Sequence, residues 1–105
     1  MIVKLSKKAT LQINDSLLFL AKVSKEAAEN LFNEITDKLN SISEYPYLGP
    51  SIIDQPIKSV DMRKIDISNG RYGLIYAVLK DYIYVYYFID FRMNDIITSK
   101  GFEKL

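Results

Sequence analysis

A chain of 105 residues with 49% hydrophobic side chains is long enough to bury one core and too short to build two domains. It has no histidine and no cysteine, which excludes disulfides, the usual zinc sites and the common catalytic triads. Its net charge of +1 argues against a protein that neutralises many phosphates. We therefore expect one domain over residues 1–105, with no metal and no cofactor, in the reducing cytoplasm.

The first half of the chain predicts a short strand followed by two amphipathic helices. Residues 2–5 are short and β-branched, as in a strand, and Ser6 is a suitable N-cap for the helix that follows. Apolar residues then recur every three or four positions, at Ala9, Ile13, Leu17, Leu20 and Ala21, and Leu11, Leu18 and Phe19 widen this stripe. Ser24 restarts the pattern, which continues through Ala28, Leu31, Ile35, Leu39 and Ile42. The short joint near Ser24 predicts an antiparallel helical hairpin whose two stripes pack into the core.

A Pro-Gly corner separates the helices from the second half. Pro46 cannot continue a helix and Gly49 is free to turn, so residues 45–50 end the second helix. Residues 51–60 predict a loop, because Pro56 interrupts any strand. No apolar run reaches the roughly 18 residues of a membrane span, and the N-terminus lacks a signal-peptide pattern.

The second half predicts a sheet. Residues 63–67 alternate in polarity, and Ser68-Asn69-Gly70 is a turn signal. Residues 71–79 are apolar on both faces, which is typical of a central strand covered on both sides. In residues 82–89 alternation sets Ile83, Val85, Tyr87 and Ile89 against Tyr82, Tyr84, Tyr86 and Phe88, and we expect Tyr76 and Tyr87 to lie in the core. Residues 93–105 carry little pattern and fit a short helix, a strand or a flexible tail. The predicted fold is α+β, in the order β-α-α-β-β-β.

Five features taken together resemble the RelE/ParE toxin superfamily of bacterial type II toxin–antitoxin systems. They cover residues 2–94 and are the stripe of residues 9–20, the Tyr45-Pro46-x-x-Gly49 corner, Arg63-Lys64-Ile65, the tract of residues 70–76, and Ile89-Asp90-Phe91-Arg92. The resemblance implies a helical hairpin packed on a small curved antiparallel sheet. It also implies a hetero-oligomer with a cognate antitoxin, whose C-terminal segment wraps the toxin and silences it.

The chain departs from the ribonucleases of this superfamily at three positions. Gly73 replaces the arginine that typically follows the central tyrosine, Asp90 stands where many relatives place a histidine, and no tyrosine follows Tyr87. RNA cleavage needs a base, an acid and cations, and no general base stands beside the basic residues. The resemblance therefore favours the ParE-like branch, which inhibits growth by binding an essential target such as DNA gyrase without catalysis.

Two alternatives remain open at this stage. In one, the protein is a RelE-like, ribosome-dependent messenger-RNA endonuclease in which Arg63, Arg71 and Arg92 contact the phosphate and the transition state. In the other, it is a non-toxic interaction protein that retains the fold and the antitoxin-binding groove.

Four basic residues and three tyrosines are the candidate site residues. Arg63, Lys64, Arg71 and Arg92 are expected to contact the target. The structural alternative is an ion pair of Arg63 with a carboxylate such as Asp90, and a solvated surface position for Arg71 and Lys64. If the helices cover the other face of the last strand, Tyr82, Tyr84 and Tyr86 form an exposed aromatic patch that binds the antitoxin. The alternative is that this face packs on the protein's own helices.

Overall fold

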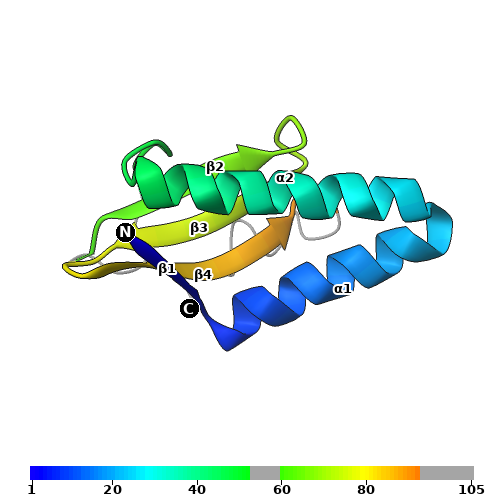
Figure 1. Cartoon of the computed structure of the whole chain (residues 1–105), viewed down its shortest axis with the longest axis horizontal. Helices are drawn as coiled ribbons and strands as arrows, with labels where there is room; N and C mark the ends of the chain where they lie inside the picture. Colours follow the sequence, from blue (N-terminus) through cyan, green and yellow to red (C-terminus); the bar gives the residue numbers. More distant parts are fainter. Residues whose placement is uncertain (53–59, 93–105) are drawn as a thin grey trace.

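A computed structural model describes residues 1–52 and 60–92 and shows two helices in one layer against a four-stranded sheet in the other (Figure 1). The elements in chain order are β1 (Ile2–Leu5), α1 (Lys7–Val23), α2 (Lys25–Glu44), β2 (Met62–Ile67), β3 (Tyr72–Val78) and β4 (Tyr82–Asp90). This order and the α+β class confirm the prediction. The expectations for residues 93–105, and for most of the loop at 51–60, fall outside the described residues.

Two serines define the helical hairpin. The Ser6 hydroxyl accepts a hydrogen bond from the Ala9 N–H at 2.9 Å and caps α1. Ser24 serves both helices: its own N–H donates to the Leu20 carbonyl at 2.8 Å, and its hydroxyl accepts from the Ala27 N–H at 3.1 Å. A single residue thus ends α1 and begins α2, and the helices diverge away from this joint (Figure 1). None of the helices in the described part of the chain is long and apolar enough to cross a membrane.

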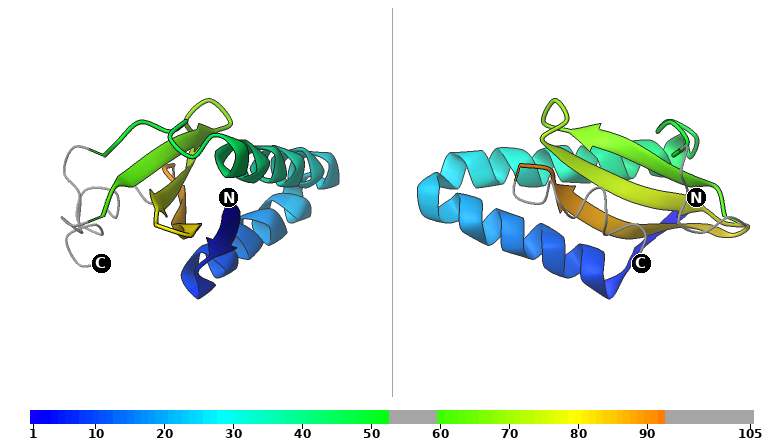
Figure 2. Two further views of the ribbon diagram at one scale, coloured as in Figure 1. Left: turned by 60° about the vertical axis from the view of Figure 1, so that its left-hand side comes forward. Right: turned by 180° about the vertical axis from the view of Figure 1, so that it is seen from behind.

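The strand order is β1-β4-β3-β2, with both helices on one side of the sheet (Figure 2). The pairs β2–β3 and β3–β4 are antiparallel, but β1 pairs with β4 in parallel. The expected all-antiparallel sheet was therefore wrong for its first strand. The hairpin returns the chain to the end where β1 begins, as the 2.7 Å bond from the Met1 ammonium to the Ser43 carbonyl shows. Because β2 starts at that end and two reversals follow, β4 runs in the same direction as β1.

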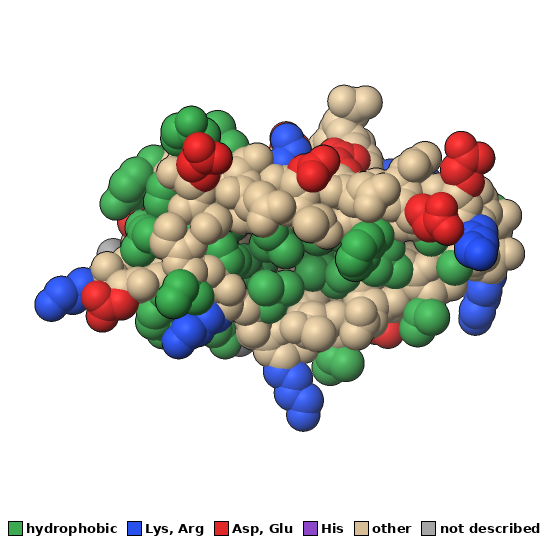
Figure 3. Space-filling view, viewed as in Figure 1, with side chains coloured by type: hydrophobic (Ala, Val, Ile, Leu, Met, Phe, Trp, Pro, Cys, Tyr) green, Lys and Arg blue, Asp and Glu red, His purple; other side chains and the backbone are tan. Residues whose placement is uncertain are grey.

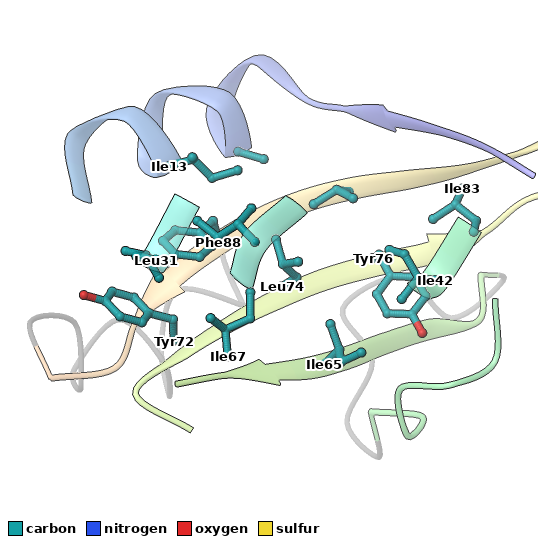
Figure 4. Close-up of a cluster of buried hydrophobic side chains, with 13 residues drawn as sticks. Ile13, Leu31, Ile42, Ile65, Ile67, Tyr72, Leu74, Tyr76, Ile83 and Phe88 are labelled. Carbon is teal, nitrogen blue, oxygen red and sulfur yellow. The ribbon is translucent and has the colours of Figure 1, made fainter. Parts of the chain in front are cut away.

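The main core lies between the helices and the sheet (Figure 4). Ala9, Ile13, Leu31, Ile35 and Ile42 are buried, so the predicted stripes are confirmed at these positions. The prediction that Leu11, Leu18 and Phe19 widen the buried stripe of α1 was wrong. These side chains are 52%, 65% and 51% exposed, because the sheet covers only one side of the helix.

Strand β3 is covered on both faces, as predicted. Every residue from Tyr72 to Ala77 is buried. Tyr72, Leu74 and Tyr76 belong to the main core, whereas Ile75 and Ala77 join Met62 and Ile89 in a smaller apolar cluster on the opposite face.

A bulge in β4 changes which side chains face the helices. Ile75 pairs with Tyr87, but the next residue, Tyr76, pairs with Val85, so Tyr86 is an extra residue in β4. Beyond the bulge the alternation is reversed, and Phe88 is buried in the main core. Tyr87 is only half-buried and packs with the cluster on the opposite face. The expectation that Tyr87 lies in the core was therefore wrong, whereas Tyr76 is fully buried as expected.

Candidate functional site

Arg63 holds the corner that follows α2. Its guanidinium lies 3.0 Å from the Asp61 carboxylate, donates to the Gly49 carbonyl at 2.8 Å, and stacks 4.8 Å from the centre of the Tyr47 ring. The side chain is only 18% exposed. The structural alternative, an ion pair of Arg63 with a carboxylate, is thus confirmed, and the carboxylate is Asp61 and not the example named, Asp90. With its donors directed into the protein, Arg63 is a structural residue.

The Tyr-Pro-x-x-Gly corner, at the same edge of the sheet, is fixed by hydrogen bonds to the Tyr76 hydroxyl. The Gly49 N–H donates to the Tyr76 hydroxyl at 2.9 Å, and that hydroxyl donates to the Pro46 carbonyl at 2.8 Å. A Cβ at Gly49 would lie 2.6 Å from the Lys64 carbonyl oxygen, so only glycine allows this approach. Burial raises the pKa of the Tyr76 hydroxyl, and the Gly49 hydrogen bond and the Arg63 charge oppose that rise.

Lys64, Arg71 and Arg92 are called here the basic cluster, because each adjoins Phe91 through a ring contact, a backbone hydrogen bond or the next position in the chain. The Lys64 ammonium lies 4.6 Å from the centre of the Phe91 ring and 3.3 Å from the Asp66 carboxylate. The Phe91 N–H donates to the Arg71 carbonyl at 2.9 Å, and Arg92 is the next residue. The side chains of Lys64 and Arg92 are 39% and 53% exposed, which leaves them accessible to a partner. The structure thus links three of the four predicted basic residues to Phe91, Lys64 through its side chain and the two arginines through the backbone, whereas the contacts of Arg63 lie at the corner.

Gly73 provides the space that the Phe91 ring occupies. A Cβ there would lie 2.8 Å from a ring carbon of Phe91 and 3.3 Å from Cε of Lys64. An arginine at this position would displace the ring. The departure at Gly73 therefore has a packing explanation, which follows from the position of Phe91 and not from the local pattern.

Asp90 is almost buried beside the basic cluster. Its carboxylate is 8% exposed, accepts a hydrogen bond from the Arg92 N–H at 3.1 Å, and lies 3.8 Å from the Arg92 guanidinium. Together with Tyr72 it lines a cleft of about 400 Å³, whose other residues are Gln12, Asp15, Ser16, Phe19 and Phe88. A carboxylate already engaged by an arginine is poorly placed to act as a general base.

Arg71 is less solvated than the sequence predicted. Its guanidinium carbon lies 5.1 Å from the centre of the Tyr72 ring, and its Nε is buried without a hydrogen-bond partner among the described residues. Burial raises the pKa of the Tyr72 hydroxyl. The Arg71 charge opposes this rise in the pKa, and the Asp90 charge adds to it. Within residues 1–52 and 60–92 no three histidine, cysteine or acidic side chains are grouped in a way that could hold a metal ion.

Tyr82, Tyr84, Tyr86 and Tyr87 form a continuous row of rings, the tyrosine strip, on the face of β4 opposite the helices. Consecutive ring centres lie 6.4, 4.7 and 6.1 Å apart, and the first two contacts are edge-to-face. All four side chains are half-buried. Burial raises the pKa of the Tyr86 and Tyr87 hydroxyls, and the neighbouring tyrosines add to the rise. The three predicted tyrosines therefore do share one surface, to which the bulge adds Tyr87.

Two apolar grooves on the helical side were missed by sequence reasoning, because each forms between two elements that only the tertiary structure brings together. One, of about 490 Å³, lies between α1 and α2 and includes Leu18 and Phe32, which are 65% and 55% exposed. The other, of about 650 Å³, lies between β1 and the end of α2 and includes Val3 and Leu39. Figure 3 shows hydrophobic side chains along the space between the two helices. Exposed apolar surface of this kind is typical of a protein that binds another polypeptide.

The two-layer arrangement, in the order β-α-α-β-β-β, is the α+β fold that the resemblance to RelE/ParE-like toxins implies. The chain is similar in structure to a chain of the solved structure titled "Chromosomal ParDE TA system from P. aeruginosa", with a TM-score of 0.65 over 86% of this chain and 95% of that chain. The two sequences are 13% identical, so this likeness establishes the shared fold. No family model matches the sequence, and no curated protein matches it.

Proposed function

We propose that the protein is the toxin of a type II toxin–antitoxin pair of the ParE-like kind, acting in the cytoplasm and silenced by a cognate antitoxin. The observation that carries this proposal is the structural likeness to a chain of a ParDE toxin–antitoxin system over nearly the whole domain. The order of the sequence motifs from residue 2 to residue 94 supports the same assignment.

The antitoxin would bind the surfaces that the fold leaves apolar and accessible. Tyr82, Tyr84 and Tyr86 provide one such surface on the outer face of the sheet. The two helical grooves, with Leu18 and Phe32 exposed, provide another on the opposite side of the molecule. A polypeptide segment that wraps the domain would cover both, which fits an antitoxin better than a compact globular partner.

The target would be bound through the basic cluster, and DNA gyrase is the target we propose. The accessible Lys64 ammonium lies over the Phe91 ring, and the accessible Arg92 side chain follows Phe91 in the chain, so exposed cations and an aromatic residue occur together, a combination frequent at protein interfaces. We favour target binding over RNA cleavage for two reasons. The nearby carboxylate of Asp90 already contacts the Arg92 guanidinium, and the Arg63 guanidinium is bound to Asp61 and to the Gly49 carbonyl of the corner.

The test is induced expression of the chain without a partner, followed by two target assays. We expect growth arrest, inhibition of supercoiling by purified gyrase, and no cleavage of ribosome-bound messenger RNA. Cleavage of the message would replace the proposal with the RelE-like reading. Normal growth at confirmed expression would favour the non-toxic interaction protein.

The variant Arg92→Ala examines the role of the basic cluster. We expect it to lose growth arrest while keeping the circular dichroism spectrum and unfolding midpoint of the parent. Lys80→Ala is the matched control, since Lys80 is an exposed basic residue close to the β3–β4 turn, at the other end of these strands. Undiminished arrest by folded Arg92→Ala protein would remove this residue from the target surface.

A further inference from the structure

The tyrosine strip has a lysine near each end. The Lys4 ammonium lies 4.3 Å from the centre of the Tyr82 ring, and the Lys8 ammonium lies 5.4 Å from that of Tyr87. Both lysines are far from the tyrosines in sequence. The parallel pairing of β1 with β4 brings Lys4 to this surface. Neither lysine makes an ion pair within residues 1–52 and 60–92.

Three other cations near the sheet are paired with carboxylates. The side chains of Arg63, Lys64 and Arg92 lie 3.0, 3.3 and 3.8 Å from carboxylate oxygens of the protein itself. The strip therefore combines two ammonium groups that have no anion in the described structure with a row of phenol rings. Such a surface donates hydrogen bonds, carries positive charge, and presents aromatic area between its two charged ends.

We infer that the tyrosine strip binds an acidic, extended segment of a partner polypeptide. This inference rests on the proposed function, in which that segment belongs to the antitoxin. Carboxylates accept charge-assisted hydrogen bonds from ammonium and phenol groups, which are stronger than bonds between neutral groups. Single-stranded nucleic acid is the less favoured occupant, because bases stack on free ring faces and ammonium groups already lie over Tyr82 and Tyr87.

The length of the strip sets the length of the segment. Tyr82 lies opposite Leu79 and Tyr87 opposite Ile75, so with the bulge the strip spans four residue steps of β3, about 13 Å. An extended segment of about five residues spans that distance, and its alternate side chains point to the same side. Acidic side chains at its two ends would reach Lys4 and Lys8, while an inner side chain contacts the edges of Tyr84 and Tyr86.

The test is a nuclear magnetic resonance titration of the isotope-labelled full chain with the blocked peptide Glu-Val-Glu-Val-Glu. The comparison ligands are Gln-Val-Gln-Val-Gln and a short oligothymidylate. We expect shifts at β1 and β4 with the glutamate peptide, and binding weaker by about tenfold with the glutamine peptide or at high salt, where exposed charge pairs are screened. Equal binding of the two peptides, shifts confined to other elements, or preference for the oligothymidylate would each overturn the inference.

Two double variants test whether the peptide binds at Lys4 and Lys8, and growth arrest is measured separately for each. Lys4→Gln with Lys8→Gln should weaken peptide binding by about tenfold, whereas Lys22→Gln with Lys25→Gln, exposed on the hairpin, should not change it. Both pairs should keep growth arrest, because none of these lysines is in the basic cluster. Full affinity in the first pair contradicts the inference about the strip, while failure of the unaltered chain to arrest growth contradicts the proposed function instead.

Discussion

Gly49→Ala should destabilise the protein strongly, although Gly49 adopts no positive φ angle that would make alanine strained in itself. The added Cβ would lie 2.6 Å from the Lys64 carbonyl oxygen and 2.9 Å from the Tyr76 hydroxyl oxygen. The first of these is a backbone atom in β2, so the corner or the strand must move. A single methyl group therefore tests how tightly the corner after α2 is held against the sheet.

The size of the effect follows from what the movement breaks. The corner is held by the 2.9 Å bond from the Gly49 N–H to Tyr76 and by the 2.8 Å bond from Arg63 to the Gly49 carbonyl. The first is worth about 1 kcal/mol and the second, made by a charged donor, about 2 kcal/mol. Movement that relieves the clash gives up both, so we expect a loss of about 3 kcal/mol, a large part of the roughly 5–15 kcal/mol typical of a domain.

Urea unfolding followed by far-ultraviolet circular dichroism measures this loss. The midpoint should fall with little change in the slope of the transition, because the surface exposed on unfolding stays the same. Leu48→Ala is the control, since Leu48 is the adjacent residue and is 51% exposed. Its cost should be within about 0.5 kcal/mol.

Tyr76→Phe separates hydrogen bonding from steric fit. It removes only the hydroxyl, leaves the Gly49 N–H and the Pro46 carbonyl without their partner, and should cost about 1–3 kcal/mol. Because both substitutions break the same bond, the double variant should lose less than the sum of the single losses. If Gly49→Ala costs no more than Leu48→Ala, or if the two losses simply add, the proposed coupling at the corner is wrong.

Three further predictions concern contacts elsewhere in the fold. Glu34→Ala should cost about 2 kcal/mol in urea unfolding, because the Glu34 carboxylate accepts from the Ser68 N–H at 2.7 Å and the Ser68 hydroxyl at 2.8 Å; a neutral effect would contradict a role in ordering the β2–β3 turn. Gln12→Ala should cost about 1–3 kcal/mol by the same assay, since the Phe88 N–H would lose its 2.9 Å bond to the Gln12 side chain, and an unchanged midpoint would show that another acceptor replaces it. Stability should fall as the pH rises above about 10, because burial raises the pKa of the Tyr76 hydroxyl and the unfolded chain then loses its proton first. The unfolding midpoint measured from about pH 8 to about pH 11 checks this, and a pH dependence unaltered in Tyr76→Phe would exclude that residue as a source.

Several features of the protein follow from local sequence alone. Spacings of three and four residues place Ile13, Leu31 and Ile35 on the buried faces of two helices, because a helix repeats its side-chain direction every 3.6 residues. A run of apolar residues on both faces marks β3 as the central strand. Ser24 marks the joint between the helices, since its side chain can cap the second one. These patterns depend on neighbours in the chain, so the sequence contains them directly.

Other features were decided only when distant segments came together. The parallel β1–β4 pair brings Lys4 beside Tyr82, and this contact joins residues at opposite ends of the chain. The single extra residue in β4 reverses every later side chain, which is why Phe88 and not Tyr87 enters the main core. Alternation along one strand cannot reveal a bulge, because a bulge is defined by pairing with the neighbouring strand.

The roles of the charged residues also depended on the tertiary structure. Sequence left open whether Arg63 contacts a carboxylate of the protein, and packing directs its guanidinium to Asp61 and the Gly49 carbonyl. The same packing lays Phe91 over Gly73 and places the Lys64 ammonium over the Phe91 ring. Composition and periodicity thus determined the elements and their order, whereas the partner of each charge depended on which backbones came within hydrogen-bonding distance, and only the folded chain sets those distances.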